Sequence, residues 1–125
     1  MHSKIKSLAK KYAAEFIEVR RHLHAHPELS YQEYETSKFV QGKLSEFGIP
    51  FTIMATTGVM GLIEGKNPGS RIIALRADMD ALPIREENDI PYRSKNEGVM
   101  HACGHDVHTT CLLGAAKILN ELKDE

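Results

Sequence analysis

The stretch Arg71–Asp80, RIIALRADMD, decides which fold class the sequence predicts. It is almost continuously apolar from Ile72 to Leu75, as in a β-strand that is covered on both faces. Two carboxylates, Asp78 and Asp80, follow directly, so we expect them at the carboxyl end of that strand. In open α/β sheets, ligand sites form at this edge. The stretch therefore predicts an α/β fold with a site near the two aspartates.

The residues before this stretch predict a β-hairpin. Gly58–Glu64 is a short β-prone run, and Gly65–Ser70 has the composition of a turn. We therefore expect Gly58–Glu64 to pair with Arg71–Arg76. The run Phe51–Thr57, just before them, is also strand-like.

Two helices are predicted before the strands. In the first, apolar residues recur at steps of three and four and line one helix face. These residues are Ile5, Leu8, Tyr12, Phe16, Val19 and Leu23. Pro27 bars continuation of this helix. Ser30 and Glu33 form an S-x-x-E capping box that predicts the start of a second helix, which we expect to end at Gly48 with Pro50 behind it.

A long loop and a third helix are predicted after the strands. Ala81–Gly98 is polar and contains proline, which is typical of a loop, and its acidic residues Glu86, Glu87 and Asp89 are expected to be solvated. Asp106 is expected to cap a last helix. The apolar stripe of that helix is predicted to be Leu112, Ala115, Ala116, Leu119 and Leu122.

Composition narrows the class of protein. The chain has 125 residues, of which 42% are hydrophobic and 26% charged, as expected for one globular domain. Its formal net charge is −1, so no basic excess points to a nucleic acid or an anionic membrane. No apolar run approaches the roughly 18 residues that span a bilayer, and no signal peptide is evident. We therefore expect a cytoplasmic protein.

The segment Met100–His108, MHACGHDVH, concentrates side chains that bind metals. A thiolate at Cys103 and an imidazole at His105 can hold one divalent cation or bridge two. Zinc-like ions need three or four protein ligands, so the Asp78 and Asp80 region is the natural place for the remainder. The alternative is that the segment is only a capped helix start.

Other histidines and cysteines have simpler interpretations. His22, His24 and His26 lie where the first helix is expected to end, and there a structural or cleft-lining role is favoured over metal ligation. Cys111 belongs to the apolar run CLLGAA, where it is either reactive or simply buried. Because the chain has two cysteines and is expected in a reducing compartment, a disulfide is disfavoured.

Three long motifs occur in a characteristic order: RRHLHAHPELSYQEYET at 20–36, ALRADMDALPI at 74–84 and GVMHACGHDVHTTCLLGAA at 98–116. Together they resemble the N-terminal part of the M20 metallopeptidase family, in particular its amidohydrolase branch of hippurate, N-acyl-amino-acid and auxin-conjugate hydrolases. The resemblance extends from about Phe16 to about Leu119. It implies that residues 1–125 form an incomplete N-terminal part of a zinc-exopeptidase-like catalytic domain, in which helices flank a mixed central sheet.

The resemblance also implies roles for individual residues. Cys103 and His105 match two ligands of a pair of divalent ions, which can be Zn, Mn, Co or Ni, and the cysteine sulfur is similar to a shared ligand. Asp80 matches a catalytic-site aspartate that orients a ligand. Asp78 stands where the wider superfamily has a histidine ligand, so no ligand role is assigned to it. His101 and His108 belong to the motif without an assigned role.

The activity implied by the resemblance is hydrolysis of the amide bond of N-acyl amino acids or related peptide-like conjugates by a metal-activated water. The glutamate base, the later histidine ligands and a dimerisation domain would lie beyond Glu125. We therefore expect weak metal binding and little or no hydrolysis from these 125 residues. A sheet with an unpaired edge would favour a homo-oligomer. The alternatives are a non-enzymatic metal-binding module and a structural fragment that pairs with a complementary chain.

Overall fold

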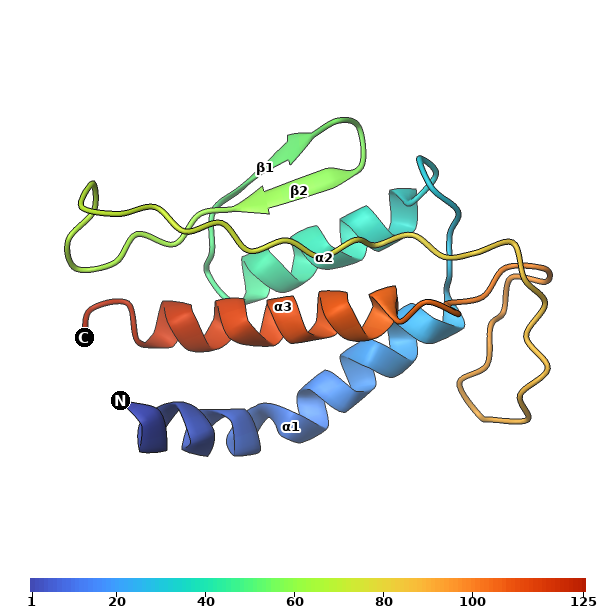
Figure 1. Cartoon of the computed structure of the whole chain (residues 1–125), viewed down its shortest axis with the longest axis horizontal. Helices are drawn as coiled ribbons and strands as arrows, with labels where there is room; N and C mark the ends of the chain where they lie inside the picture. The colour runs from blue at the N-terminus through green and yellow to red at the C-terminus, as the bar shows by residue number, and fades with distance from the viewer.

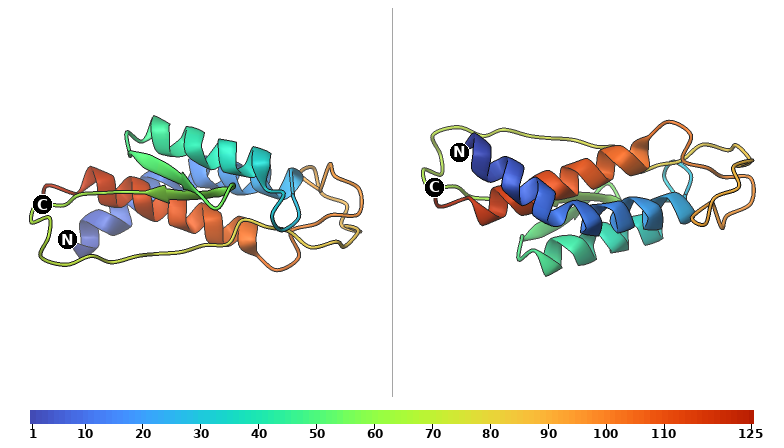
Figure 2. Two further views of the ribbon diagram at one scale, coloured as in Figure 1. Left: turned by 90° about the horizontal axis from the view of Figure 1, so that it is seen from above. Right: turned by 90° about the horizontal axis from the view of Figure 1, so that it is seen from below.

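The computed structural model describes all residues from Met1 to Glu125 as three helices and one β-hairpin (Figure 1). The elements are α1 (His2–Ala25), α2 (Tyr34–Glu46), β1 (Phe51–Met54), β2 (Gly58–Gly61) and α3 (His105–Glu121). Helix α3 packs along α1, and α2 contacts both α3 and β2 (Figure 2). Both termini lie at one end of the molecule, and the loop before α3 lies at the other (Figure 1). None of the three helices is long and apolar enough to cross a membrane.

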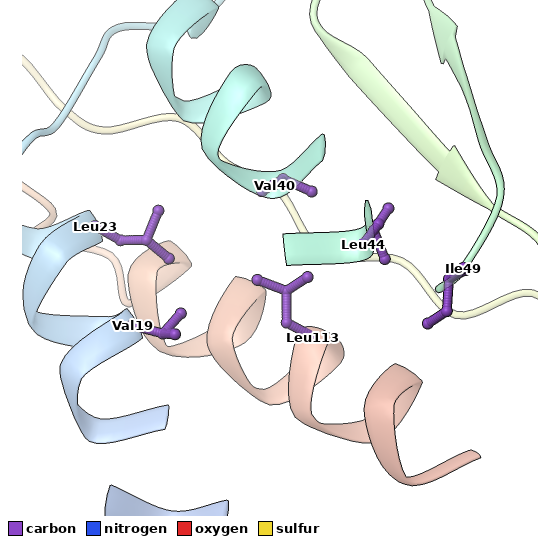
Figure 3. Packing of buried hydrophobic residues seen from close by; sticks show 6 residues of the cluster. All are labelled: Val19, Leu23, Val40, Leu44, Ile49 and Leu113. Atoms are coloured by element: carbon purple, nitrogen blue, oxygen red, sulfur yellow. The ribbon is translucent and has the colours of Figure 1, made fainter. Parts of the chain in front are cut away.

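The core forms where the three helices meet. Its fully packed members are Val19, Leu23, Val40, Leu44, Ile49 and Leu113 (Figure 3). The first two come from α1 and confirm the helical stripe predicted there. Leu113 is the contribution of α3, and its side chain is only 4% exposed. One buried leucine thus fastens α3 to the remainder of the fold.

The predicted start of α2 is wrong. Glu33 is the N-cap residue, but no side chain caps the helix from that position, and Ser30 is not part of a capping box. The carboxylate of Glu28, which lies outside the helix, caps its first turn instead. It accepts the main-chain N–H groups of Glu35 and Thr36 at 3.1 and 2.6 Å. The sequence pattern failed because the chain turns sharply between Ser30 and the helix, which frees the serine for another partner.

The predicted end of α2 is confirmed. Gly48 has a φ of 69°, a left-handed conformation that glycine adopts without steric cost. The N–H of Ile49 donates to the carbonyl oxygen of Leu44 at 2.9 Å, and the N–H of Gly48 donates to that of Ser45 at 3.0 Å. These two bonds form a Schellman motif, which satisfies carbonyl groups at the helix end.

The α/β fold class is confirmed, but the predicted hairpin is wrong. β2 pairs in antiparallel register with β1, from Phe51 opposite Gly61 to Met54 opposite Gly58. Residues 71–76 are not a strand, and Ile72–Leu75 make no backbone hydrogen bonds. Ile72 is 90% exposed. β2 instead follows β1 over a link of only three residues, and a short link of this kind favours pairing between sequence neighbours.

The predicted cap of α3 is also wrong, and its predicted stripe is right only in part, since Ala116 packs against the core but Leu119 does not. The N-cap is Gly104, with a φ of 93°, and Asp106 lies inside the first turn. Leu113 is buried, whereas Leu119, which we predicted for the buried stripe, is 49% exposed. The inward-facing carboxylate of Asp106, which is 2% exposed, fixes the rotation of the helix. Leu122 is buried as predicted.

Candidate metal centre

The start of α3 meets the end of the extended segment 71–80 through Asp80 and His105. The Nδ1 atom of His105 lies 2.9 Å from Asp80 Oδ1 and 3.0 Å from the main-chain oxygen of Asp80. The hydroxyl of Ser30 donates to the other carboxylate oxygen at 2.5 Å. The two side chains of the pair are 19% and 23% exposed, so the contact is largely shielded from water. The sequence predicted Asp80 and His105 for one site, and the structure brings them together.

This contact fixes the charge of Asp80 and the free nitrogen of His105. The hydrogen bond from Ser30 is the main reason that the pKa of Asp80 lies below its usual value; burial opposes the shift, and the hydrogen bond from His105 adds to it. An ionised Asp80 only accepts hydrogen bonds, so Nδ1 of His105 carries the proton. The Nε2 atom then keeps its lone pair for a cation, which is the usual carboxylate–histidine–metal arrangement.

Cys103 is the second candidate donor of the site. It is a free and exposed thiol, two residues before His105. Between them, Gly104 adopts a positive φ, which lets the chain turn from the loop into α3. A thiolate and an imidazole are a donor set that suits zinc-like ions. The structure has no group of three or more His, Cys, Asp or Glu side chains arranged to hold a metal ion, so this chain presents two donors.

Asp78 does not join this pair. Its carboxylate is paired with the guanidinium of Arg76, and its main-chain oxygen accepts the hydroxyl of Thr109 at 3.0 Å. Asp78 therefore anchors the extended segment to α3. No hydrogen bond links its side chain to His105 or Cys103, and the structure provides no contact that would make it a ligand.

The two unassigned histidines of the motif differ in their surroundings. His101 is 5% exposed, and neither of its ring nitrogens has a hydrogen-bond partner. Burial is the main cause that lowers the pKa of His101, so the ring is neutral near pH 7. His108 is exposed, and its ring centroid lies 5.9 Å from that of His105. His108 therefore borders the site from the solvent side.

The sequence analysis missed a group of ionisable side chains next to the site, of which three are buried and Arg20 is partly exposed. We call it the Asp106 cluster: Arg20, His24, Glu86 and Asp106. Glu86 was expected in a solvated loop, and this is wrong, because it is only 3% exposed. Burial raises the pKa of Glu86, but hydrogen bonds from His24, Ser94 and Asn88 outweigh it and hold the pKa below its usual value. Periodicity gave no signal for Glu86, since it lies in an irregular loop.

The remaining side-chain expectations have mixed outcomes. His24 is 3% exposed within the Asp106 cluster, so the structural role favoured for it is confirmed. His22 and His26 are exposed at the end of α1. Cys111 is exposed, so its interpretation as a buried residue is wrong.

Known proteins match the part of the chain that contains the candidate site. Residues 74–125, which include Asp80, Cys103 and His105, match the family described as Peptidase family M20/M25/M40. The chain is 53% identical over 122 residues to the N-acyl-L-amino acid amidohydrolase of Geobacillus stearothermophilus, covering 97% of this chain and 33% of that protein. It is 53% identical over 111 residues to the N-acetyl-L-cysteine deacetylase of Bacillus subtilis, covering 88% of this chain and 26% of that protein.

A solved structure shows the same backbone. The crystal structure of the YxeP protein of Bacillus subtilis, described as a dinuclear metal-binding peptidase of the M20 family, superposes with a TM-score of 0.87. The two sequences are 46% identical, and the match covers 91% of this chain and 32% of that one. The chain thus spans about a third of the length of the relatives it matches. In its motifs, its fold and its relatives, the chain is therefore similar to M20 peptidases and related amidohydrolases over the third of their length that it spans.

Proposed function

We propose that this chain is the N-terminal part of the catalytic domain of a metal-dependent amidohydrolase that hydrolyses the amide bond of N-acyl amino acids. The observation that carries the proposal is the His105–Asp80 contact, which leaves Nε2 of His105 free, two residues from the exposed thiol of Cys103. The names of the relatives support the substrate class, because they include an N-acyl-L-amino acid amidohydrolase and an N-acetyl-L-cysteine deacetylase.

Each residue of the site has a distinct task in this proposal. Cys103 and His105 would hold divalent ions, with the sulfur shared between two of them. Asp80 keeps the proton on Nδ1 of His105, and Ser30 keeps Asp80 ionised through its hydrogen bond. When bound, the divalent ions supply a nucleophilic water near neutral pH and polarise the scissile carbonyl. Zinc, manganese, cobalt and nickel all suit such ligands.

Two donors make a weak site, because structural and catalytic zinc sites use three or four protein ligands. By its family resemblance, the proposed enzyme draws its glutamate base and further histidine ligands from sequence beyond these 125 residues. We therefore expect the chain alone to bind divalent metal weakly and to hydrolyse little or no N-acyl amino acid.

The test is made on the purified 125-residue chain. Cobalt titration should give thiolate-to-metal charge-transfer absorption that disappears in Cys103→Ala. Cys111→Ala is the matched control, since Cys111 is also a free and exposed thiol but is not near Asp80 in the hydrogen-bond network. If cobalt absorption is equally strong in Cys103→Ala and is lost in Cys111→Ala, the proposed centre is wrong.

The same samples test the expected lack of turnover. Hydrolysis of an N-acetyl amino acid is followed with and without cobalt. Turnover that depends on Cys103 would show that the chain assembles a complete site by itself or by association, and our expectation of an inactive chain would then be wrong. Metal binding without turnover would leave the alternative of a non-enzymatic metal-binding module for the isolated chain.

We also propose that the chain self-associates as a homo-oligomer through residues 71–76. This segment exposes Ile72, Ile73 and Leu75 at 90%, 74% and 59%, and the backbone of Ile72–Leu75 is unpaired, which is the combination that favours strand addition. Analytical ultracentrifugation should show a dimer that dissociates in Ile73→Lys, whereas Ile17→Lys, at a half-exposed position on α1, should leave it intact. A wild-type chain that stays monomeric at high concentration would rule this out. The cytoplasmic location stays a prediction.

A further inference from the structure

The Asp106 cluster, which consists of three buried side chains and the partly exposed Arg20, lies next to the residues of the proposed metal centre. Its members come from α1, from the loop before α3 and from the first turn of α3. His24 is held on both sides, with Nδ1 2.8 Å from Asp106 Oδ2 and Nε2 2.9 Å from Glu86 Oε1. The Nε atom of Arg20 donates to Asp106 Oδ2 at 3.0 Å. The cluster thus joins three separate segments at one point.

The ring of His24 lies between the two carboxylates of the cluster, and its Nδ1 atom also lies 3.3 Å from Nη2 of Arg20. Arg20 contacts Asp106 as well, so Arg20, His24 and Asp106 meet at one point, and Glu86 holds the other side of the ring. Glu86 also accepts the N–H of Ser94 at 2.5 Å, which ties the loop to the same point.

Stability alone does not account for such a cluster. Buried ion pairs are often no more stabilising than apolar side chains of the same size, whereas they fix one geometry firmly. The position of this cluster is therefore informative. Asp106 follows His105 directly, and its main-chain oxygen accepts the hydroxyl of Thr110 at 2.7 Å within α3. Gly104, the N-cap residue, offers no side chain to hold this turn.

The first turn of α3 is consequently fixed from two sides. On one side Asp80 holds Nδ1 of His105, and on the other the Asp106 cluster holds the next residue. If the contacts of Asp106 with His24 and Arg20 loosened, the first turn of α3 could rotate and carry His105 away from Cys103. Apart from the bond of the Thr110 hydroxyl to Asp106 within α3, no other side-chain hydrogen bond reaches residues 103–106.

We infer that His24 and Glu86 are positioning residues for the metal donors Cys103 and His105, acting through Asp106. The inference rests on the proposed function, because it concerns the same donors. Neither residue is bonded to a donor, so a change at Glu86 reaches the centre through His24 and through the loop that Glu86 holds at Ser94. Outer partners of metal ligands commonly change affinity by about 10- to 100-fold when they are removed.

The first variant is Glu86→Gln, which keeps the size of the side chain and removes its charge. We expect cobalt affinity to fall by about 10-fold or more, with an altered thiolate-to-cobalt band. The matched control is Thr57→Val, which removes a buried hydrogen bond to Glu33 of 2.9 Å elsewhere in the fold. The control should lose stability and keep its cobalt affinity. Equal cobalt affinity in Glu86→Gln and the wild type would overturn the inference.

A second variant covers the case in which Glu86→Gln does not fold. The double variant His24→Gln with Glu86→Gln replaces the His24–Glu86 pair with two neutral amides and leaves the Arg20–Asp106 pair in place. It should fold and show the same loss of cobalt affinity. If it folds and binds cobalt as the wild type does, the positioning role is wrong.

A readout without metal separates this inference from the proposed function. NMR of the metal-free chain follows the Nδ1–H proton of His105, which should shift or exchange faster in Glu86→Gln and the double variant but not in Thr57→Val. If the wild type fails to bind cobalt through Cys103, the proposed function fails, and the NMR signal alone then decides the inference. An unchanged His105 signal in a folded variant would refute it.

Discussion

Replacing Leu113 with alanine should lower the free energy of unfolding by about 3 kcal/mol. Leu113 is 4% exposed and packs in one cluster with Val19, Leu23 and Leu44, so its removal leaves a cavity between three helices. The loss combines the transfer free energy of the deleted methyl and methylene groups with the cost of the cavity. Because small domains are stable by only about 5–15 kcal/mol, this loss is easily measured.

The matched control lies on the same helix. Leu119 is 49% exposed, so Leu119→Ala removes side-chain surface that is half in contact with water already. We expect it to cost less than about 1 kcal/mol. Urea unfolding followed by circular dichroism gives both values, and the m-values should stay unchanged if the variants unfold in the same way. Equal losses for the two variants would mean that the helix is rotated as the sequence suggested, and our assignment of its buried face would be refuted.

Three further perturbations test the site and its supports. Asp80→Asn should weaken cobalt binding by about 10- to 100-fold, because an amide holds the His105 Nδ1 proton less firmly than a carboxylate, and Asp78→Asn should leave binding unchanged in the same titration. Gly48→Ala should cost about 1 kcal/mol in urea unfolding, since its φ of 69° is strained for alanine, and a loss near zero would contradict the Schellman end. The pKa of Glu86 is lowered by folding, so its stabilising effect is present above its ordinary value of 4.5 and is lost as the pH falls below that value. Urea unfolding above and below this pH should therefore show a steeper loss in the wild type than in Glu86→Gln, and parallel losses would contradict the assignment.

Local sequence patterns correctly predicted those elements whose formation depends on interactions between sequence neighbours. The apolar period from Ile5 to Leu23 gave α1, and Gly48 gave the end of α2, because both signals act over a few residues. The proximity of Asp80 and His105 was also predicted, because the segment after the apolar run Ile72–Leu75 and the segment Met100–His108 were both expected at one site. In each case the residues whose pattern led to the prediction are the same residues that form the helix, the helix end or the contact.

Features set by distant partners were not predictable in this way. The run Ile72–Leu75 reads as a strand, but a strand needs a neighbour, and the run does not specify one. The rotation of α3 depends on Asp106 finding His24 and Arg20 from a helix far away in sequence. A difference of one position, Leu113 instead of Leu112, is enough to change the buried face of a helix. Composition alone placed Glu86 in solvent because its buried partners are not its sequence neighbours.

The exposed, unpaired segment 71–76 also determines how the chain would respond to a protease. Extended backbone without hydrogen-bond partners fits a protease cleft, and Arg76 offers trypsin a cleavage site there. Cutting after Arg76 would divide the chain into residues 1–76 and 77–125, with α1, α2 and the hairpin in the first piece. Asp80, Cys103 and His105 would stay together in the second, and Leu113 would still hold the pieces against each other. Ser30, His24 and Arg20 would lie in the first piece, so after the cut the geometry of the metal donors would depend on contacts between two separate chains.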